Sequence, residues 1–256
     1  MNERISLIRQ HIQEKGEVKL SELEVFFEGV SSMTLRRDLK KLEESGDVVL
    51  TRGGAKSISH LSRIKEELYS KRSSENTAEK YAIAKKALEY VEEGRSIFID
   101  SGTTVMYLAR LIENQKLFIT TSAPNVALEC AKDQNAVINL IGGNLNRDNL
   151  SLSGITALNF LDNINIDTAF IASSGFSFKN GFTCGDYSEG EIKKKVIEKA
   201  SRTIVLMDNT KFGKNLPFTF AKLSDVDLVI TDDGVSEEIK KKLCQGVRKS
   251  GMAKIN

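Results

Sequence analysis

The feature that most constrains this fold is a capped, basic helix followed by a short hairpin, between residues 31 and 57. Ser31 has the side chain of a helix N-cap, and Leu35, Leu39 and Leu42 recur on one face. The other faces hold Ser32, Met33, Thr34, Arg36, Arg37, Lys40 and Lys41. Short polar side chains near the start of such a helix reach base edges, while Arg and Lys contact phosphates or guanine. The segment predicts a recognition helix.

The residues around this helix predict its neighbours. Ile5, Ile8 and Ile12 have helical spacing, and Gly16 follows them as a C-cap. Ser21 and Glu24 have capping-box spacing, with Leu20 and Val25 at the positions of a hydrophobic staple. After the recognition helix, residues 48–50 and the residues from 55 onward predict two wing strands around Gly53 and Gly54, with Arg52 as a basic wing residue. Three short helices and a hairpin predict a winged helix-turn-helix over residues 1–57.

The charge distribution supports DNA as the partner only locally. A net charge of +2 is too small to indicate a nucleic-acid binder by itself. Residues 29–56 hold six Lys and Arg against four acids, whereas residues 1–28 hold four against six. A basic run on a helix is usually a solvated face. The agreement between caps, helix spacing and the basic wing favours DNA binding instead.

Cysteine usage and hydropathy indicate the compartment. Cys130, Cys184 and Cys244 are odd in number and lack metal-ligand spacing, so we expect reduced thiols, no disulfide, no metal site and no cofactor. The start of the sequence is followed by no apolar segment of a secretory signal. No apolar run approaches the roughly 18 residues that cross a bilayer. We expect a soluble, cytoplasmic protein without a membrane partner.

Residues 58–76 form a polar linker. Leu61, Ile64 and Leu68 keep helical spacing, which predicts a short connecting helix within it. A passive tether and a segment whose geometry depends on a ligand both remain open.

Residues 77–256 alternate between strand and helix patterns. Short apolar runs rich in β-branched and aromatic residues predict strands at residues 97–99, 117–119, 137–141, 169–171, 204–206 and 228–230. Helical patterns lie between them at residues 81–91, 105–112, 157–161 and 191–200. Buried strands separated by helices predict an α/β domain with a mostly parallel sheet, covered on both faces.

Polar residues gather directly after these strands. The turn from Asp100 through Ser101, Gly102 and Thr103 to Thr104 precedes a helix, and such a turn offers backbone N–H groups and hydroxyls to a phosphate. The other loops contain Thr121, Gly143, Gly175 and Lys211. Each loop alone is ordinary turn chemistry. Together they predict a ligand site beyond the carboxyl ends of the strands.

The N-terminal segment resembles the DNA-binding signature of DeoR-family bacterial transcriptional regulators. The resemblance rests on residues 34–39, Leu42, Glu43, Gly46 and the Arg-Gly-Gly-Ala string at residues 52–55. It implies that Ser31, Thr34, Arg36 and Arg37 lie on the recognition helix and that Asp38 anchors the motif. Glu24 stands where the family usually has Ala.

The C-terminal segment resembles the effector domain of the same family. The resemblance rests on residues 100–104, Gly142 and Gly143, residues 167–170 and 181–183, Glu189, Glu191, Lys193 and residues 208–213. That domain is similar in fold to ribose-phosphate isomerases and glucosamine-phosphate deaminases and senses phosphorylated sugars. By this resemblance Ser101, Gly102, Thr103 and Thr104 hold a phosphate, and Asp100, Gly143, Glu189 and Lys211 face the sugar. Thr121 stands where Asn is common at a sugar contact.

The two segments together predict a repressor of a sugar-metabolism operon, with operator DNA and a phosphorylated sugar as partners. We expect a homo-oligomer, either dimer or tetramer, and no catalytic residues. The alternative is a sugar-phosphate isomerase or deaminase-like enzyme with an appended DNA-binding domain, in which Asp100, Glu189, Asp208 and Lys211 supply acid and base groups. Neither histidine serves that chemistry, because His11 lies in the DNA-binding segment and His60 in the linker. The runs Lys193–Lys195 and Lys240–Lys242 are interpreted as solvated helix faces.

Overall fold

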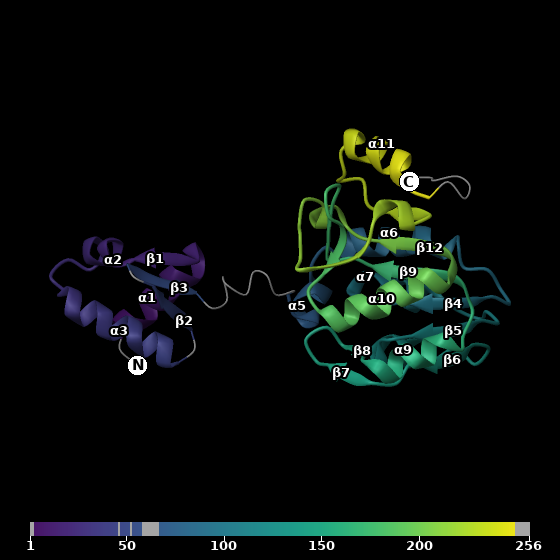
Figure 1. The fold of residues 1–256 in the computed structure, drawn as a ribbon, viewed down its shortest axis with the longest axis horizontal. Coiled ribbons are helices and arrows are strands. Elements are labelled where there is room, and N and C mark those ends of the chain that lie inside the picture. The colour runs from purple at the N-terminus through teal and green to yellow at the C-terminus, as the bar shows by residue number, and fades with distance from the viewer. Residues whose placement is uncertain (1–2, 46, 52, 58–66, 249–256) are drawn as a thin grey trace. The chain divides into compact units, whose positions relative to one another are not determined.

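The computed structural model describes residues 3–45, 47–51, 53–57 and 67–248 (Figure 1). The chain divides into two compact units, residues 1–65 and 66–256, and each is described by itself.

The N-terminal unit is a winged helix-turn-helix, as predicted. Its helices are α1 (Glu3–Lys15), α2 (Leu20–Phe26) and α3 (Ser32–Glu44), and its strands are β1 (Glu17–Lys19), β2 (Val48–Thr51) and β3 (Gly54–Ser57). The strands form an antiparallel sheet in the order β1-β3-β2. Ile8, Leu23 and Leu35 are buried between the helices. The sequence did not predict β1, because three residues with one buried side chain, Val18, set no pattern.

The start of α2 differs from the prediction. The capping box at Ser21 and Glu24 is wrong, because the helix already begins at Leu20 and its N-cap is Lys19. The Lys19 N–H donates to Glu22 Oε2 over 3.1 Å, and the Leu20 N–H donates to the Gly53 carbonyl over 2.7 Å. This hydrogen bond to the wing fixes the backbone at Leu20, so the helix begins before the position that the sequence pattern predicted.

The two other predicted caps in this unit are present, and the staple is not. Gly16 has a φ of +85° and its N–H donates to the Ile12 carbonyl, so it ends α1 as predicted. Ser31 Oγ accepts the Thr34 N–H over 3.3 Å. The Leu20–Val25 staple is wrong, since Val25 is 75% exposed. Gly46, the predicted end of α3, lies outside the described residues.

The C-terminal unit is built on a six-stranded sheet in which every strand pair is parallel. Its strands are β4 (Ser96–Ile99), β5 (Phe118–Thr121), β6 (Val137–Leu140), β9 (Ile166–Ala172), β12 (Ala200–Leu206) and β14 (Leu228–Ile230). Their order is β14-β12-β9-β4-β5-β6. The α/β fold class and the predicted strand segments are confirmed.

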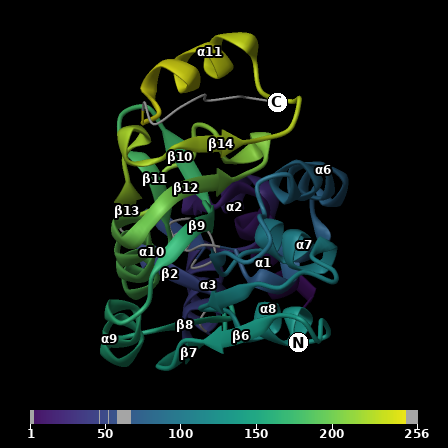
Figure 2. The ribbon, with the colours of Figure 1, turned by 90° about the vertical axis from the view of Figure 1, so that its right-hand side faces the viewer.

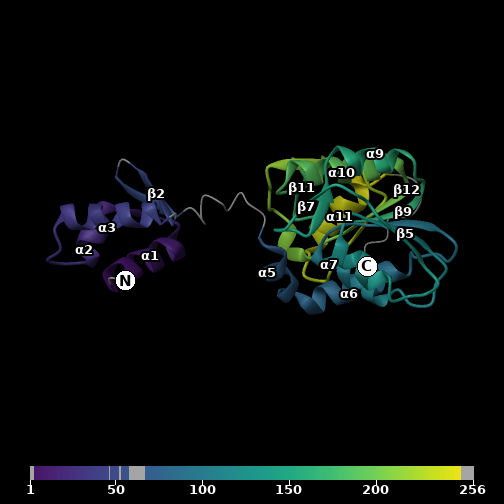
Figure 3. The same ribbon diagram turned by 90° about the horizontal axis from the view of Figure 1, so that it is seen from below.

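Helices cover both faces of this sheet. Helices α6 (Thr77–Leu88), α7 (Thr103–Leu111) and α8 (Pro124–Cys130) lie on one face, and α9 (Ile155–Asp162) and α10 (Tyr187–Lys199) lie on the other (Figures 2 and 3). Alternate strand residues supply the two cores: Ile97 and Ile99 pack against α6 to α8, while Phe98 packs on the opposite side. Helix α10 begins before the predicted residue 191 because the Asp186 carboxylate accepts the Glu189 N–H over 2.8 Å.

Smaller elements complete the unit. Strands β10 (Gly175–Ser177), β11 (Gly181–Cys184) and β13 (Phe218–Ala221) form an antiparallel sheet, and β7 (Asn144–Asn146) and β8 (Ser151–Ser153) form a hairpin. The helical segments are α5 (Tyr69–Ser74), α11 (Glu237–Gly246) and two 3-10 turns, η2 (Asn209–Lys211) and η3 (Leu223–Asp225). None of the strands β7, β8, β10, β11 and β13 holds a continuous run of three apolar residues, so the sequence did not predict them. Across the described residues, no helix combines the length and apolar composition that a bilayer crossing requires.

The strand order reverses between β4 and β9. From β4 the chain proceeds outward to β5 and β6, whereas from β9 it proceeds in the other direction to β12 and β14. In open parallel sheets the carboxyl ends of the strands at such a switch point border a crevice that binds ligands.

Candidate nucleic-acid interface and effector site

Helix α3 presents a polar, exposed surface at its N-terminal half. Ser31 Oγ and Thr34 Oγ1 share a 2.9 Å hydrogen bond at the cap. The predicted DNA contacts Ser32, Met33, Arg36, Arg37 and Lys40 are exposed, and Met33 is 69% exposed. No carboxylate of the described residues forms an ion pair with Arg36, Arg37 or Lys40. These cations are therefore available to phosphates or bases. Arg52 lies outside the described residues.

Two acidic residues hold α3 in place. Asp38 is 3% exposed and accepts the Arg4 Nε–H of α1 over 2.6 Å, which is the anchoring role predicted for it. Glu24 of α2 accepts a hydrogen bond from Ser32 Oγ. The recognition helix is thus tied to both preceding helices by polar contacts as well as by its leucines.

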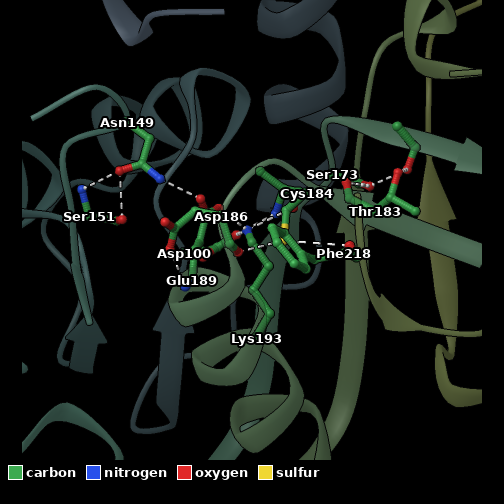
Figure 4. Close-up of polar contacts among 12 residues, drawn as sticks. Asp100, Asn149, Ser151, Ser173, Thr183, Cys184, Asp186, Glu189, Lys193 and Phe218 are labelled. Atoms are coloured by element: carbon green, nitrogen blue, oxygen red, sulfur yellow. Dashed lines mark hydrogen bonds and ion pairs between the residues drawn. The ribbon is translucent and has the colours of Figure 1, made fainter. Parts of the chain in front are cut away.

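A buried cluster of charged side chains lies at the switch point of the large sheet (Figure 4). Lys193 of α10 donates from Nζ to Asp100 Oδ2, to Glu189 Oε1 at 3.0 Å and to the Ala172 carbonyl at 3.0 Å. The Ala172 N–H donates to Asp100 Oδ2 over 2.9 Å. Asn149 Nδ2 donates to the other oxygen of Glu189. The ends of β4 and β9, the start of α10 and the β7–β8 hairpin therefore meet at one point.

The cluster fixes the protonation of its lysine. Burial by itself lowers the pKa of Lys193, but the adjacent Asp100 and Glu189 carboxylates outweigh it and raise that pKa above its ordinary value. Lys193 therefore stays charged. Its predicted place on a solvated face is wrong, since it is 1% exposed; Lys194 and Lys195 do pair with the surface acids Glu191 and Asp162.

The turn after β4 has the geometry of an anion cradle. Gly102 lies so close to β9 that a Cβ there would be 2.5 Å from the Ala172 Cβ. Thr103 and Thr104 begin α7, and no side chain caps its first N–H groups. Within the described structure, Ser101 Oγ and Asp100 Oδ1 are buried without a hydrogen-bond partner. Free N–H groups and an unused hydroxyl at a helix N-terminus suit a phosphate.

The other predicted effector residues lie on neighbouring loops. Thr121 Oγ1 accepts the Ala123 N–H over 3.1 Å, which shapes its own turn. Gly143 has a φ of +120°, and Gly175 allows the Lys214 carbonyl a close approach. Lys211 lies 3.8 Å from Asp208 Oδ2 at the end of β12. The structure thus joins Asp100 and Glu189 in one cluster, at the turn from Asp100 to Thr104, here called the phosphate turn after its predicted ligand. Lys211 lies beside Asp208 instead.

Asn149 and Lys193 were missed as site residues. Glu189 and Lys193 have the four-residue spacing of a helical ion pair, but Glu191 and Lys195 have it as well, so the spacing did not single out Lys193. Nothing near Asn149 in the sequence indicates its contact with Glu189, which is 40 residues away.

Two further observations limit what else the unit holds. Among the described residues, no three His, Cys, Asp or Glu side chains gather as metal ligands. An open cavity of about 430 Å³ lies between the C-terminal ends of α7 and α8, beside the loops that precede β5 and β6. It is at the amino ends of the strands, away from the switch-point cluster.

Two family models match the chain. A model described as a DeoR-like helix-turn-helix domain matches residues 4–60, and one described as a DeoR C terminal sensor domain matches residues 75–233.

Named relatives are transcriptional regulators. The transcriptional regulator GlpR of Haloferax volcanii is 32% identical over 84% of this chain and 84% of its own length. The regulator IolR of Bacillus subtilis is 32% identical over 92% of both. A putative aga operon transcriptional repressor of Escherichia coli O157:H7 is 29% identical over 98% of this chain and 92% of its own.

Solved structures resemble the chain more remotely. The sorbitol operon regulator SorC of Klebsiella pneumoniae has a TM-score of 0.43 at 11% identity, over 93% of this chain and 97% of that one. Ribose 5-phosphate isomerase A of Methanocaldococcus jannaschii has a TM-score of 0.40 at 19% identity, over 54% and 55%.

Proposed function

Because this chain belongs to the DeoR family of transcriptional regulators, we propose that it represses a sugar-metabolism operon and releases its operator when a phosphorylated sugar binds. The observation that carries this proposal is the buried Asp100–Glu189–Lys193 cluster beside the open phosphate turn, in a chain that also holds a recognition helix. A buried polar cluster at the switch point is suited to bind a small ligand, and helix α3 is suited to bind DNA.

On the DNA side, the exposed end of α3 enters the major groove and the wing lies beside it. The proposed contacts are Ser31, Ser32, Met33, Thr34, Arg36, Arg37, Lys40 and Arg52. Paired units of an oligomer then occupy repeated or palindromic half-sites. We place the protein in the cytoplasm, as a dimer or tetramer.

On the effector side, the phosphate lies at the N-terminus of α7 and the sugar hydroxyls face the carboxylates. Ser101, Gly102, Thr103 and Thr104 bind the phosphate, and Asp100, Thr121, Gly143, Gly175, Glu189 and Lys211 surround the sugar. Asp100 Oδ1 and Ser101 Oγ supply an acceptor and a donor that no group in the described part of the chain uses. The domains in this proposal are residues 1–57, the linker 58–76 and the effector domain 77–256.

The names of the relatives support the proposal that the target is an operon. One is named for the aga operon as a putative repressor, and the others are named as regulators. The isomerase alternative has less support, because an isomerase needs no DNA-binding unit, and the helix-turn-helix family model matches residues 4–60 of this chain. We therefore propose a sensor that is not an enzyme.

A gel shift on the DNA upstream of the chain's own coding region tests the proposal. The expected result is a specific shift that one member of a panel of pentose, hexose and ketose phosphates reverses. A specific shift that no sugar phosphate alters would contradict the effector assignment. Absence of any specific shift, together with isomerase activity on the same panel, would favour the enzyme.

A further inference from the structure

Residues 67–76, here called the connector, follow the DNA-binding unit in the chain and are bound across the carboxyl-end loops of the large sheet. At one end the Tyr69 N–H donates to the Asp148 carbonyl over 2.7 Å, and Asn125 Nδ2 donates to the Tyr69 hydroxyl over 2.8 Å. Asp148 lies in the β7–β8 hairpin, and Asn125 lies in the first turn of α8. Helix α5 of the connector also packs against α7, whose N-terminus forms the phosphate turn.

At the other end the connector is bound to the loop after β12. Asn76, at a φ of +50°, places its Nδ2 3.4 Å from both Asp208 Oδ1 and Thr210 Oγ1. Lys80 of α6 is 1% exposed and donates to the carbonyls of Arg72 and Glu75. Burial lowers the pKa of Lys80, and nearby Asp208 opposes that change. A buried ammonium on two connector carbonyls fixes the end of α5.

Two adjacent residues of the β7–β8 hairpin, Asp148 and Asn149, link the connector to the buried Asp100–Glu189–Lys193 cluster. The Asp148 carbonyl accepts the connector's Tyr69 N–H, and the next side chain, Asn149, donates to Glu189 of the cluster. Asn149 Oδ1 also accepts from the Ser151 N–H at 3.2 Å and from Ser151 Oγ at 2.7 Å, so its side chain is fixed on both sides. A ligand that moves Glu189 must therefore displace Asn149 or break its hydrogen bond.

We propose that the β7–β8 hairpin transmits effector occupancy to the connector, with Asn149 as the positioning residue. The inference rests on the proposed function and names the path by which the sensed ligand acts on the segment leading to the DNA-binding unit. The bound connector corresponds to one ligand state and a released connector to the other.

Hydrogen exchange on the full chain, without DNA or sugar, tests the path directly. Asn149→Asp keeps the acceptor for Ser151 but places an oxygen against Glu189, so the contact with the cluster is lost. We expect the peptide covering residues 67–76 to exchange several-fold faster in this variant. Asn163→Asp is the matched control, because the Asn163 side chain is exposed and bonds only to Asn159 among the described residues. Unchanged exchange of residues 67–76 in Asn149→Asp, with the rest of the unit protected, would overturn the inference.

The reverse perturbation decides the matter if Asn149→Asp unfolds the unit. The double variant Tyr69→Phe/Asn76→Gly removes the two side-chain hydrogen bonds described above, which join the connector to α8 and to the loop after β12. Glycine keeps the positive φ at residue 76 without strain. We expect faster exchange across residues 144–153. The control Tyr81→Phe/Asn114→Gly makes the same changes at an exposed tyrosine and at an asparagine with a φ of +56°. Wild-type exchange of the hairpin in the double variant would refute transmission.

The effect of sugar phosphates on operator affinity is a further measurement, and it would not change if the connector had only a structural role. The ratio of operator Kd values with and without a mixture of ribose 5-phosphate, fructose 6-phosphate and glucosamine 6-phosphate measures the coupling. The connector variant should bring this ratio close to one, whereas the control keeps the wild-type ratio. A wild-type ratio in the connector variant counts against the inference. If the wild type itself does not respond, the proposed effector class fails, and the exchange experiments still decide the path.

Discussion

Replacing Lys193 by methionine should destabilise the C-terminal unit far more than the same change one residue later. Lys193→Met keeps the length of the side chain but removes the ammonium that donates to Asp100, Glu189 and the Ala172 carbonyl. Two carboxylates are then left side by side in a buried site. Lys194→Met removes only a surface pair with Glu191, in which the lysine is 43% exposed.

The expected magnitudes differ several-fold. Removing one partner of a buried ion pair costs about 3–5 kcal/mol, because the remaining charge has no compensation. An exposed pair contributes about 0–1 kcal/mol. With a urea dependence of about 2–3 kcal/mol per molar, Lys193→Met lowers the unfolding midpoint by roughly 1–2.5 M, whereas Lys194→Met shifts it by less than about 0.5 M.

Far-UV circular dichroism of the full chain in urea measures both variants. The chain has two compact units, so the transition of the larger unit is the one to follow. If Lys193→Met and Lys194→Met shift this midpoint equally, the buried cluster is not the stabilising network described above.

The raised pKa of Lys193 predicts how the difference in urea midpoint between wild type and Lys193→Met changes with pH. The pKa of Lys193 is raised in the folded chain, so its stabilisation is fully present below its ordinary pKa of 10.5 and is lost as the pH rises through the folded pKa. The midpoint difference between wild type and Lys193→Met should therefore not narrow as the pH rises from 7 to 9, and it should narrow only in strong alkali. A difference that narrows between pH 7 and 9 would contradict the raised pKa.

The remaining predictions concern DNA binding, release and packing. Arg36→Ala or Arg37→Ala should weaken operator binding by about 1–3 kcal/mol if the residue contacts a base, as fluorescence anisotropy would measure; undiminished affinity in both removes the recognition-helix assignment. Thr103→Glu should leave operator binding intact but abolish release by the sugar phosphate, because a carboxylate at the start of α7 repels the phosphate; normal release would place the phosphate elsewhere. Gly102→Ala should destabilise the C-terminal unit by about 1–3 kcal/mol, because its Cβ would be 2.5 Å from the Ala172 Cβ; an unchanged thermal midpoint would show that the close approach is relieved without cost.

The sequence predicted those helices and strands that carry a clear pattern of apolar residues. The apolar runs of the six parallel strands and the leucine stripe of α3 identified the fold class, because burial on both faces leaves a continuous apolar run and burial on one face leaves a periodic stripe. The Ser31 cap was likewise a local signal. Strands β1, β7 and β8 had no such signal, since each has a single apolar residue between two polar ones.

The candidate site was predictable only where its chemistry is local. The turn from Asp100 to Thr104 precedes a helix and was found on that ground. The partner of Asp100 is 93 residues away, and no pattern near Lys193 distinguishes it from the two surface lysines that follow. The start of α2 was mispredicted for the same reason, because the bond from Leu20 to Gly53 spans 33 positions that a capping-box search does not consider.

The charge of the buried cluster determines which way round a ligand binds in the proposed site. One ammonium faces two carboxylates, so the cluster has one excess negative charge, while the neighbouring N-terminus of α7 is the positive end of a helix dipole. A ligand that enters this field is oriented by it: an anionic group is drawn to the helix end and repelled from the carboxylates, and neutral hydroxyl groups suit the other side. We therefore expect selection by polarity along the ligand, which favours a sugar with a single phosphate at one end over a sugar acid whose carboxylate would face Asp100.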